Sequence, residues 1–227
     1  MIILSSWPSQ GEENVMPLTL AYKRTDSSNR TSQLMVTIQA GMTRLDDNER
    51  TIFIDYGHRR LYRLEKGSTT CIAYPLHHEH SIIRKTMIEE LAKIQVQQEG
   101  AVEQTILGYP AKQAKILWGP GIERRRTAAP QAVEQYGLRF TPLWGKVWYT
   151  SDLPGSKELF RLANEYAPIF QQNPLLRRLD PLGLLAEIGG VAIMQQYALH
   201  QDTIKEVRRG SSETQRMELP VSCSGPP

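Results

Sequence analysis

The stretch MPLTLAYKRTDSSNRTSQLMVTIQAGM, residues 16–42, decides the fold class. Apolar residues occupy every second position in both of its halves: Leu18, Leu20 and Tyr22, then Leu34, Val36, Ile38 and Ala40. Such alternation turns one face of a strand toward an apolar surface and the other toward water. The segment DSSNRTS between the two halves is rich in turn formers. The stretch therefore predicts two antiparallel strands joined as a hairpin.

Three further segments with the character of strands follow downstream. TIFIDYG (51–57), HRRLYRLE (58–65) and TTCIAYPL (69–76) are short runs rich in β-branched and aromatic residues, separated by turn formers such as EKGS. Together with the hairpin they predict an antiparallel meander of about five strands.

The pattern then changes to helical spacing. HSIIRKTMIEELAKIQVQQEG (80–100) places Ile83, Met87, Leu91 and Ile94 on one stripe, which predicts a helix that ends at Gly100 and lies across the sheet. SKELFRLANEYAPIFQQN (156–173) predicts a second helix with Ser156 as its N-cap. PLLRRLDPLGLLAEIGG (174–190) contains prolines that predict broken helical turns.

Strand-like runs fill the rest of the chain. We expect two strands in 101–119, which pivot on Gly108, Tyr109 and Pro110, two in 136–155, and three more in 191–199, 203–210 and 215–221. Runs of strands separated by two helices indicate an α+β sheet or half-barrel rather than βαβ units. We expect one domain over 16–221, a flexible segment or the remnant of a removed leader at 1–15, and a tail at 222–227.

Composition narrows the class of function. The 227 residues carry 27 basic and 24 acidic side chains, a formal charge of +3, which is far from the excess expected of a protein whose main partner is nucleic acid. Arginine clusters at 124–126, 177–178 and 208–209 are either solvated or contact phosphate or an anionic membrane. No apolar run is long enough to span a bilayer.

The sequence contains no familiar catalytic motif. It has no G-x-S-x-G, H-E-x-x-H, Walker loop or dinucleotide-binding glycine pattern, so no enzyme and no cofactor are predicted. Its two cysteines, Cys71 and Cys223, exclude a disulfide framework and a cysteine zinc site. Spacing leaves open whether they form one bridge or are both free.

Three of the five histidines lie in PLHHEH, residues 75–80. His77, His78 and His80 could bind a first-row metal if His58 or His200 supplied a further ligand. The alternative is a polar connector between the last meander strand and the first helix, with side chains near free backbone groups of the helix start. We adopt the connector interpretation and assign no metal site.

Several short motifs carry a resemblance to a known family. ILGYPAKQAKILWG is followed by GKVWYTSDLPG, a helix and a terminal IKEVRRGSSETQRMELP. The matching positions are Gly108, Tyr109 and Ala111, then Trp148, Ser151, Asp152, Leu153, Pro154 and Gly155, and finally Met217, Leu219 and Pro220. Over residues 16–221 the chain resembles uncharacterised bacterial envelope domains related to the LolA/LolB lipoprotein-carrier superfamily.

The resemblance implies an α+β fold, with an antiparallel sheet curled into an incomplete (half) barrel and two main helices on its concave side. It also implies a periplasmic or cell-envelope location and an apolar cavity that holds an acyl chain. The chain departs from the family in having no lipobox cysteine and a longer helical segment between residues 156 and 190.

Large apolar side chains of the predicted strands are the candidate ligand contacts. We expect Tyr22, Val36, Ile38, Ile54, Trp118 and Trp148 to line a cavity for a lipid, an acyl chain or another apolar ligand. The expected partners are a lipid, a lipidated protein or another envelope protein. The alternative functions are a protein-interaction module with a filled barrel, whose apolar patch would lie at a sheet edge or on 174–190, and a metal-binding envelope protein.

Overall fold

The computed structural model describes residues 17–68, 70–77, 82–121, 132–210, 217 and 223–225. Eleven strands form one antiparallel sheet in the order β6-β5-β4-β3-β2-β1-β13-β12-β11-β8-β7, and β9 and β10 form a separate pair. The six strands of the N-terminal half are β1 (Leu18–Asp26), β2 (Thr31–Gln39), β3 (Met42–Asp46), β4 (Arg50–Asp55), β5 (Arg60–Glu65) and β6 (Cys71–Pro75). The later strands are β7 (Ile94–Ile106), β8 (Tyr109–Trp118), β9 (Val133–Gln135), β10 (Leu138–Phe140), β11 (Leu143–Thr150), β12 (Val191–Tyr197) and β13 (His200–Arg209).

The predicted hairpin is confirmed. Strands β1 and β2 pair antiparallel, with Leu20 opposite Val36 and Leu18 opposite Ile38, so the apolar residues of both strands lie on one face. The meander is one strand longer than predicted, because β3 follows β2 after a short turn at Ala40 and Gly41. Gly41 has φ of 82°, a conformation that glycine adopts without steric cost. The segment MTRLD of β3 was missed because it carries little apolar alternation.

The first predicted helix is half as long as expected. Helix α1 (Ile82–Ala92) ends before Lys93, and residues from Ile94 onward belong to β7. The reason is that Ile94 and Val96 alternate with glutamines and pair with Trp118 and Ile116 of β8, so a strand partner outweighs the helical spacing. The predicted stripe is confirmed in part: Leu91 is buried and Met87 packs against the core, but Ile83 is 79% exposed.

The second half of the helical prediction holds. Helix α3 (Ser156–Gln172) is followed by two short helices, α4 (Leu176–Leu179) and α5 (Pro181–Ile188), where broken turns were predicted. Ser156 is not the N-cap: that position is Gly155, and the Ser156 hydroxyl donates to the carbonyl of Leu153 instead. Asp180 caps α5 by accepting the Leu182 N–H at 2.9 Å.

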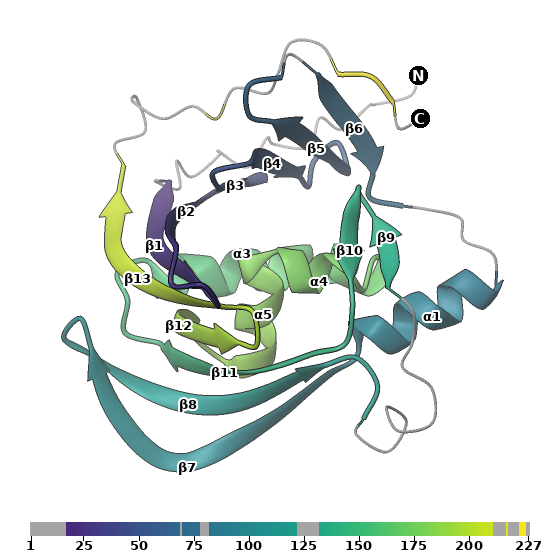
Figure 1. Ribbon diagram of the computed structural model, residues 1–227. Coiled ribbons are helices and arrows are strands. Elements are labelled where there is room, and N and C mark those ends of the chain that lie inside the picture. The colour runs from purple at the N-terminus through teal and green to yellow at the C-terminus, as the bar shows by residue number, and fades with distance from the viewer. Residues whose placement is uncertain are drawn as a thin grey trace, which may run out of the picture.

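The helices are placed unequally about the sheet. Figure 1 shows the sheet bending round α3, α4 and α5, whereas α1 lies to one side of this arrangement rather than across the sheet. The main core contains Leu20, Val36 and Ile54 from the sheet together with Leu162 and Leu182 from the helices. The fold is thus mostly antiparallel sheet with helices, an α+β class, and the sheet is open, with β6 and β7 at its two ends.

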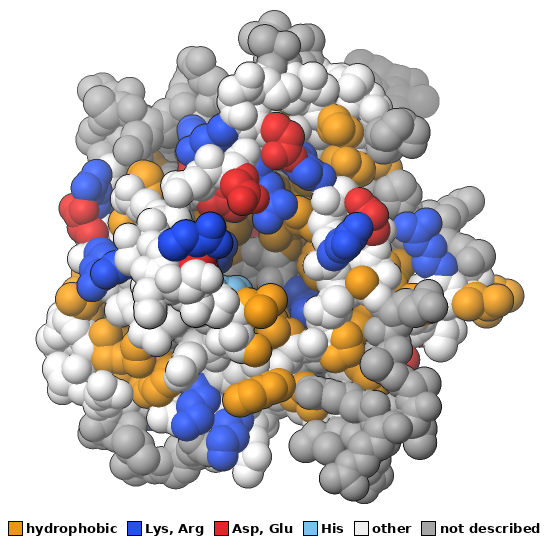
Figure 2. Space-filling view, in the orientation of Figure 1, with side chains coloured by type: hydrophobic (Ala, Val, Ile, Leu, Met, Phe, Trp, Pro, Cys, Tyr) orange, Lys and Arg blue, Asp and Glu red, His pale blue; other side chains and the backbone are white. Residues whose placement is uncertain are grey.

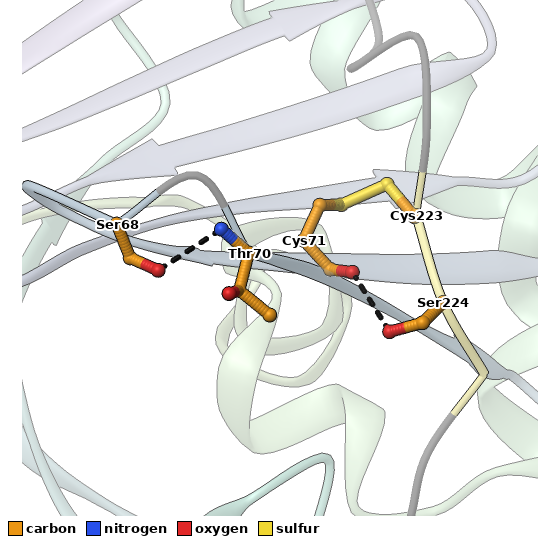
Figure 3. Close-up of a disulfide and its surroundings, with 5 residues drawn as sticks. All are labelled: Ser68, Thr70, Cys71, Cys223 and Ser224. Carbon is orange, nitrogen blue, oxygen red and sulfur yellow. Dashed lines mark hydrogen bonds between the residues drawn. A yellow bond between two sulfur atoms is a disulfide. The ribbon is translucent and has the colours of Figure 1, made fainter.

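The chain end is tied to one edge of the sheet. Cys71 of β6 and Cys223 form a disulfide across a sequence separation of 152, which answers the question that their spacing left open. The Ser224 N–H donates to the Cys71 carbonyl at 3.0 Å, and the Ala73 N–H donates to the Ser224 carbonyl at 2.8 Å. Figure 3 shows the bridge and the Ser224 hydroxyl beside the Cys71 carbonyl. The tail therefore pairs with part of the edge strand β6.

No helix among the described residues is long and apolar enough to cross a membrane. Segments 1–16 and 122–131 lie outside the described residues, as does most of the predicted last strand 215–221. The predicted leader remnant and the arginine cluster at 124–126 fall within those segments.

Candidate functional site

A cavity of about 290 Å³ lies between the sheet and the helices α3, α4 and α5. Its wall combines residues of β1 and β2 near the N-terminus with residues of β12 and β13 near the C-terminus. Figure 2 shows that this face of the molecule is hollowed near its centre, with basic and acidic side chains around the hollow. The volume is at the lower end of the range for small-molecule sites.

Aliphatic side chains form most of the wall. Leu20, Val36 and Ile38 reach it from β1 and β2, because the alternation of these strands turns them all to the same face. Leu182 and Leu185 of α5 contribute from the helical side. Such a wall favours the hydrocarbon part of a ligand, since apolar surface is transferred out of water when it is covered.

Four of the six predicted contact residues lie on the cavity wall: Tyr22, Val36, Ile38 and Trp118. The other two, Ile54 and Trp148, are buried in the main core and are not part of the wall. Trp144 of β11, which lies close to Trp148 in the sequence, is 58% exposed. Whether any of these residues contacts a ligand stays a prediction.

Polar groups form one part of the same wall. Arg24 of β1 donates through Nε and Nη2 to the two carboxylate oxygens of Asp202, both at 2.8 Å. Arg50 lies 3.5 Å from the Asp47 carboxylate. His200 Nε2 is 3.7 Å from Asp202, and burial lowers the pKa of His200 below its usual value. Two of the three wall arginines therefore face a carboxylate.

Arg178 of α4 is the third. Its guanidinium carbon lies 5.6 Å from the ring centres of both Trp118 and Phe140. Nη1 donates to the Leu91 carbonyl at 3.2 Å, and Nη2 donates to the Thr141 carbonyl at 2.7 Å. Burial lowers the pKa of Arg178 to about 10, so the side chain is still protonated at neutral pH.

The carboxyl group of Asp180 is buried on the helical side of the cavity wall. Asp180 is 1% exposed and accepts hydrogen bonds from the Tyr56 hydroxyl and the Leu182 N–H. The Tyr56 hydroxyl also lies 2.7 Å from the Thr43 hydroxyl. Burial raises the pKa of Asp180 to about 6 and that of Tyr56 well above its usual value. The network joins β3 and the turn after β4 to the junction of α4 and α5.

The histidine cluster is only partly described. His77 Nε2 lies 3.0 Å from Arg59 Nη1, whereas His78 and His80 fall outside the described residues. The two histidines proposed as further ligands have different surroundings. His58 Nδ1 is 2.8 Å from the Asp55 carboxylate, and His200 is on the cavity wall. Within the described part of the chain no three His, Cys, Asp or Glu side chains are grouped as a metal would require. The metal hypothesis is therefore untested.

Sequence reasoning missed the polar side of the cavity. Arg178 was named only as part of the arginine pair 177–178, and Asp180 and Asp202 were not candidates, because their partners come from elements far away in the chain. One signal was present in PLLRRLDPLGLL, where charged residues interrupt an otherwise apolar helical segment. A buried charge in such a segment needs a partner, which marks it for attention.

Comparisons with known proteins give little for this chain. No family model matches it, and no curated protein matches it. Among the solved structures, a structure of PNGF-II is similar over 86% of this chain and 28% of that chain, at 11% sequence identity and a TM-score of 0.42. This chain thus spans less than a third of the length of that protein, and a likeness at this level supports no conclusion about fold family or function.

Proposed function

We propose that this chain is a non-enzymatic envelope protein that holds a lipid, an acyl chain or another apolar ligand in its cavity, or docks a lipidated partner there. The observation that carries the proposal is the cavity of about 290 Å³ beside the helices, with Leu20, Val36 and Ile38 on its wall. A site lined mainly by apolar side chains with a few placed polar groups is typical of small-molecule binding.

The proposal extends to the finer shape of the fold. We describe the open sheet and its helices as an incomplete (half) β-barrel of the LolA/LolB type, with α3 as the main helix on the concave side. Two features support this description: the first strand β1 pairs with the last strand β13, and α3, α4 and α5 share one side of the sheet. The family-like phrase WYTSDLPG leads from β11 directly into α3.

An envelope location follows from the same proposal. The Cys71–Cys223 disulfide supports it, because structural disulfides persist in oxidising compartments such as the bacterial periplasm. The bridge attaches the segment at Cys223 to β6, and neither of its cysteines is on the cavity wall.

The protein-interaction alternative gains less support. It predicts an apolar patch at a sheet edge or on 174–190, but Leu175, Leu176 and Leu182 of that segment are fully buried. Among the described residues, the exposed large apolar side chains are scattered over separate parts of the fold: Ile82 and Ile83 on α1, Leu107, Trp144 and Leu199. Single exposed apolar side chains are common on protein surfaces.

The test combines native mass spectrometry of gently purified protein with uptake of a neutral fluorescent acyl probe. We expect a co-purified lipid or saturable probe binding, and we expect Val36→Phe to reduce it by filling the cavity. Leu199→Ala is the matched control, since Leu199 is 69% exposed and is not on the cavity wall. The absence of both bound lipid and probe uptake in the folded protein would refute the proposal.

A further inference from the structure

Among the described residues, the hydrogen-bond and ring partners of Arg178 are all neutral. The two backbone carbonyls of Leu91 and Thr141 accept two of its N–H groups, and the rings of Trp118 and Phe140 lie on its guanidinium. A guanidinium has five N–H donors, so these two bonds do not use its full capacity. The side chain is thus positioned without having its charge neutralised.

The three arginines on the cavity wall differ in whether a carboxylate pairs with them. Arg24 and Arg50 each have a carboxylate partner, Asp202 and Asp47. No carboxylate in the described part of the chain lies within ion-pair distance of Arg178. The nearby Asp180 instead accepts from Tyr56 and Leu182. A half-buried cation in this setting costs free energy unless an anion faces it.

The neighbouring surface defines what kind of anion fits. The Arg178 end of the cavity is formed by α4, Trp118 of β8 and Phe140 of β10, while β1 and β2 supply the aliphatic wall. A planar guanidinium suits a carboxylate or phosphate, which it can bind through two parallel hydrogen bonds. A ligand that satisfies both parts of the wall has one anionic end and one hydrocarbon chain.

We propose that Arg178 is the head-group site of the cavity and binds the carboxylate or phosphate of an anionic amphiphile, whose hydrocarbon chain lies along Leu20, Val36 and Ile38. This inference rests on the proposed function, because it assumes that the cavity takes an acyl chain. Beyond the proposed function, it specifies that the ligand is anionic and that Arg178 is the residue that recognises its charge.

The experiment compares two probes on the whole chain: dansylamino-undecanoic acid and its methyl ester, which share the chain and differ in the charge. We expect the parent protein to bind the acid more tightly than the ester by about tenfold to a hundredfold, the usual effect of a charge-assisted hydrogen bond. Arg178→Gln should remove this preference by lowering the affinity for the acid to about that for the ester. Arg178→Lys should keep part of it, because the charge remains while the paired donors are lost.

Arg177→Gln is the matched control. Arg177 is the adjacent residue of α4, but its Nη1 pairs with the Glu187 carboxylate and it is not on the cavity wall. This variant should retain the preference for the acid. The comparison of acid and ester on the parent protein needs no substitution, so equal affinities would overturn the proposal even if Arg178→Gln fails to fold. Arg178→Lys then tests the residue itself, because Arg24 and Arg50 also lie on the cavity wall.

The outcomes separate this inference from the function on which it rests. Equal affinity of the parent for acid and ester would overturn the role of Arg178 while leaving apolar ligand binding intact. Failure of the parent to bind either probe would overturn both. A phosphate-containing lipid is distinguished from a free anion by competition: lysophosphatidic acid should displace the bound acid, and displacement by inorganic phosphate at equal concentration would overturn the amphiphile assignment.

Discussion

Replacement of Asp180 by Asn should make this protein more stable than the parent at neutral pH. The Asp180 carboxyl is 1% exposed, and burial raises its pKa from 3.8 to about 6. Its ionised form is therefore disfavoured in the folded state. Asn is nearly isosteric: its carbonyl oxygen can accept the Leu182 N–H, and its amide can donate to the Tyr56 hydroxyl.

The magnitude follows from the two pKa values. A difference of about two pKa units corresponds to about 3 kcal/mol of differential stability. Because the folded pKa is the higher one, the stability that Asp180 contributes is fully present below about pH 4 and is lost as the pH rises through about 6. Asn does not titrate, so the free energy of unfolding of the variant, relative to the parent, should increase by about 3 kcal/mol across this window.

Urea unfolding followed by tryptophan fluorescence measures the effect. Parent and Asp180→Asn are compared at about pH 4 and about pH 7, and the difference between the two proteins cancels the titration of groups that they share. Tyr56→Phe is the companion variant, because the Tyr56 hydroxyl holds the Asp180 pKa down. Its loss should move the window to higher pH.

One result would refute this reasoning: a difference in unfolding free energy between parent and Asp180→Asn that is the same at both pH values to within about 0.5 kcal/mol. The carboxyl would then titrate alike in the folded and unfolded chain. Burial of Asp180 behind Tyr56 and α5 would have no influence on its ionisation.

Three further predictions concern stability, each measured as the change in unfolding free energy in urea. Replacement of both cysteines by Ala should cost about 2–5 kcal/mol, since the bridge closes a loop of 152 residues in the unfolded chain; an equal loss on adding reductant to the parent is the check, and no loss would contradict the bridge. Gly145→Ala should cost about 1–3 kcal/mol, because a Cβ there would lie 2.5 Å from the Gln196 carbonyl oxygen; a neutral result would contradict this packing of β11 on β12. Leu182→Ala should cost about 2–5 kcal/mol, whereas Leu199→Ala on the surface should change stability by less than about 0.5 kcal/mol; equal effects would contradict the assigned burial.

Sequence periodicity predicted the elements whose burial is set locally. The hairpin of β1 and β2, the broken helices α4 and α5, and helix α3 all follow from patterns that repeat within one element. The same reasoning failed at Ile94, where helical and strand spacing compete over a few residues. Pairing with strand β8 favours the strand at Ile94, and the sequence around Ile94 does not by itself reveal that β8 is its partner.

The candidate site divides in the same way. Alternation alone placed Tyr22, Val36 and Ile38 on one face, and the structure has all three on the cavity wall. Trp118 also lies on the cavity wall, whereas Ile54 and Trp148 lie in the core away from the cavity. Alternation predicts which face of a strand is buried, but it does not predict which buried side chains border a cavity.

The amino-acid sequence by itself determined that this chain builds antiparallel strands with apolar faces and a helical segment to cover them. Only the tertiary structure decided where charge meets that apolar surface. Arg24 and Asp202 are 178 positions apart, and Tyr56 and Asp180 are 124 apart. Periodicity records which face of an element is buried, while ion pairs and rings around Arg178 depend on which distant elements are packed together.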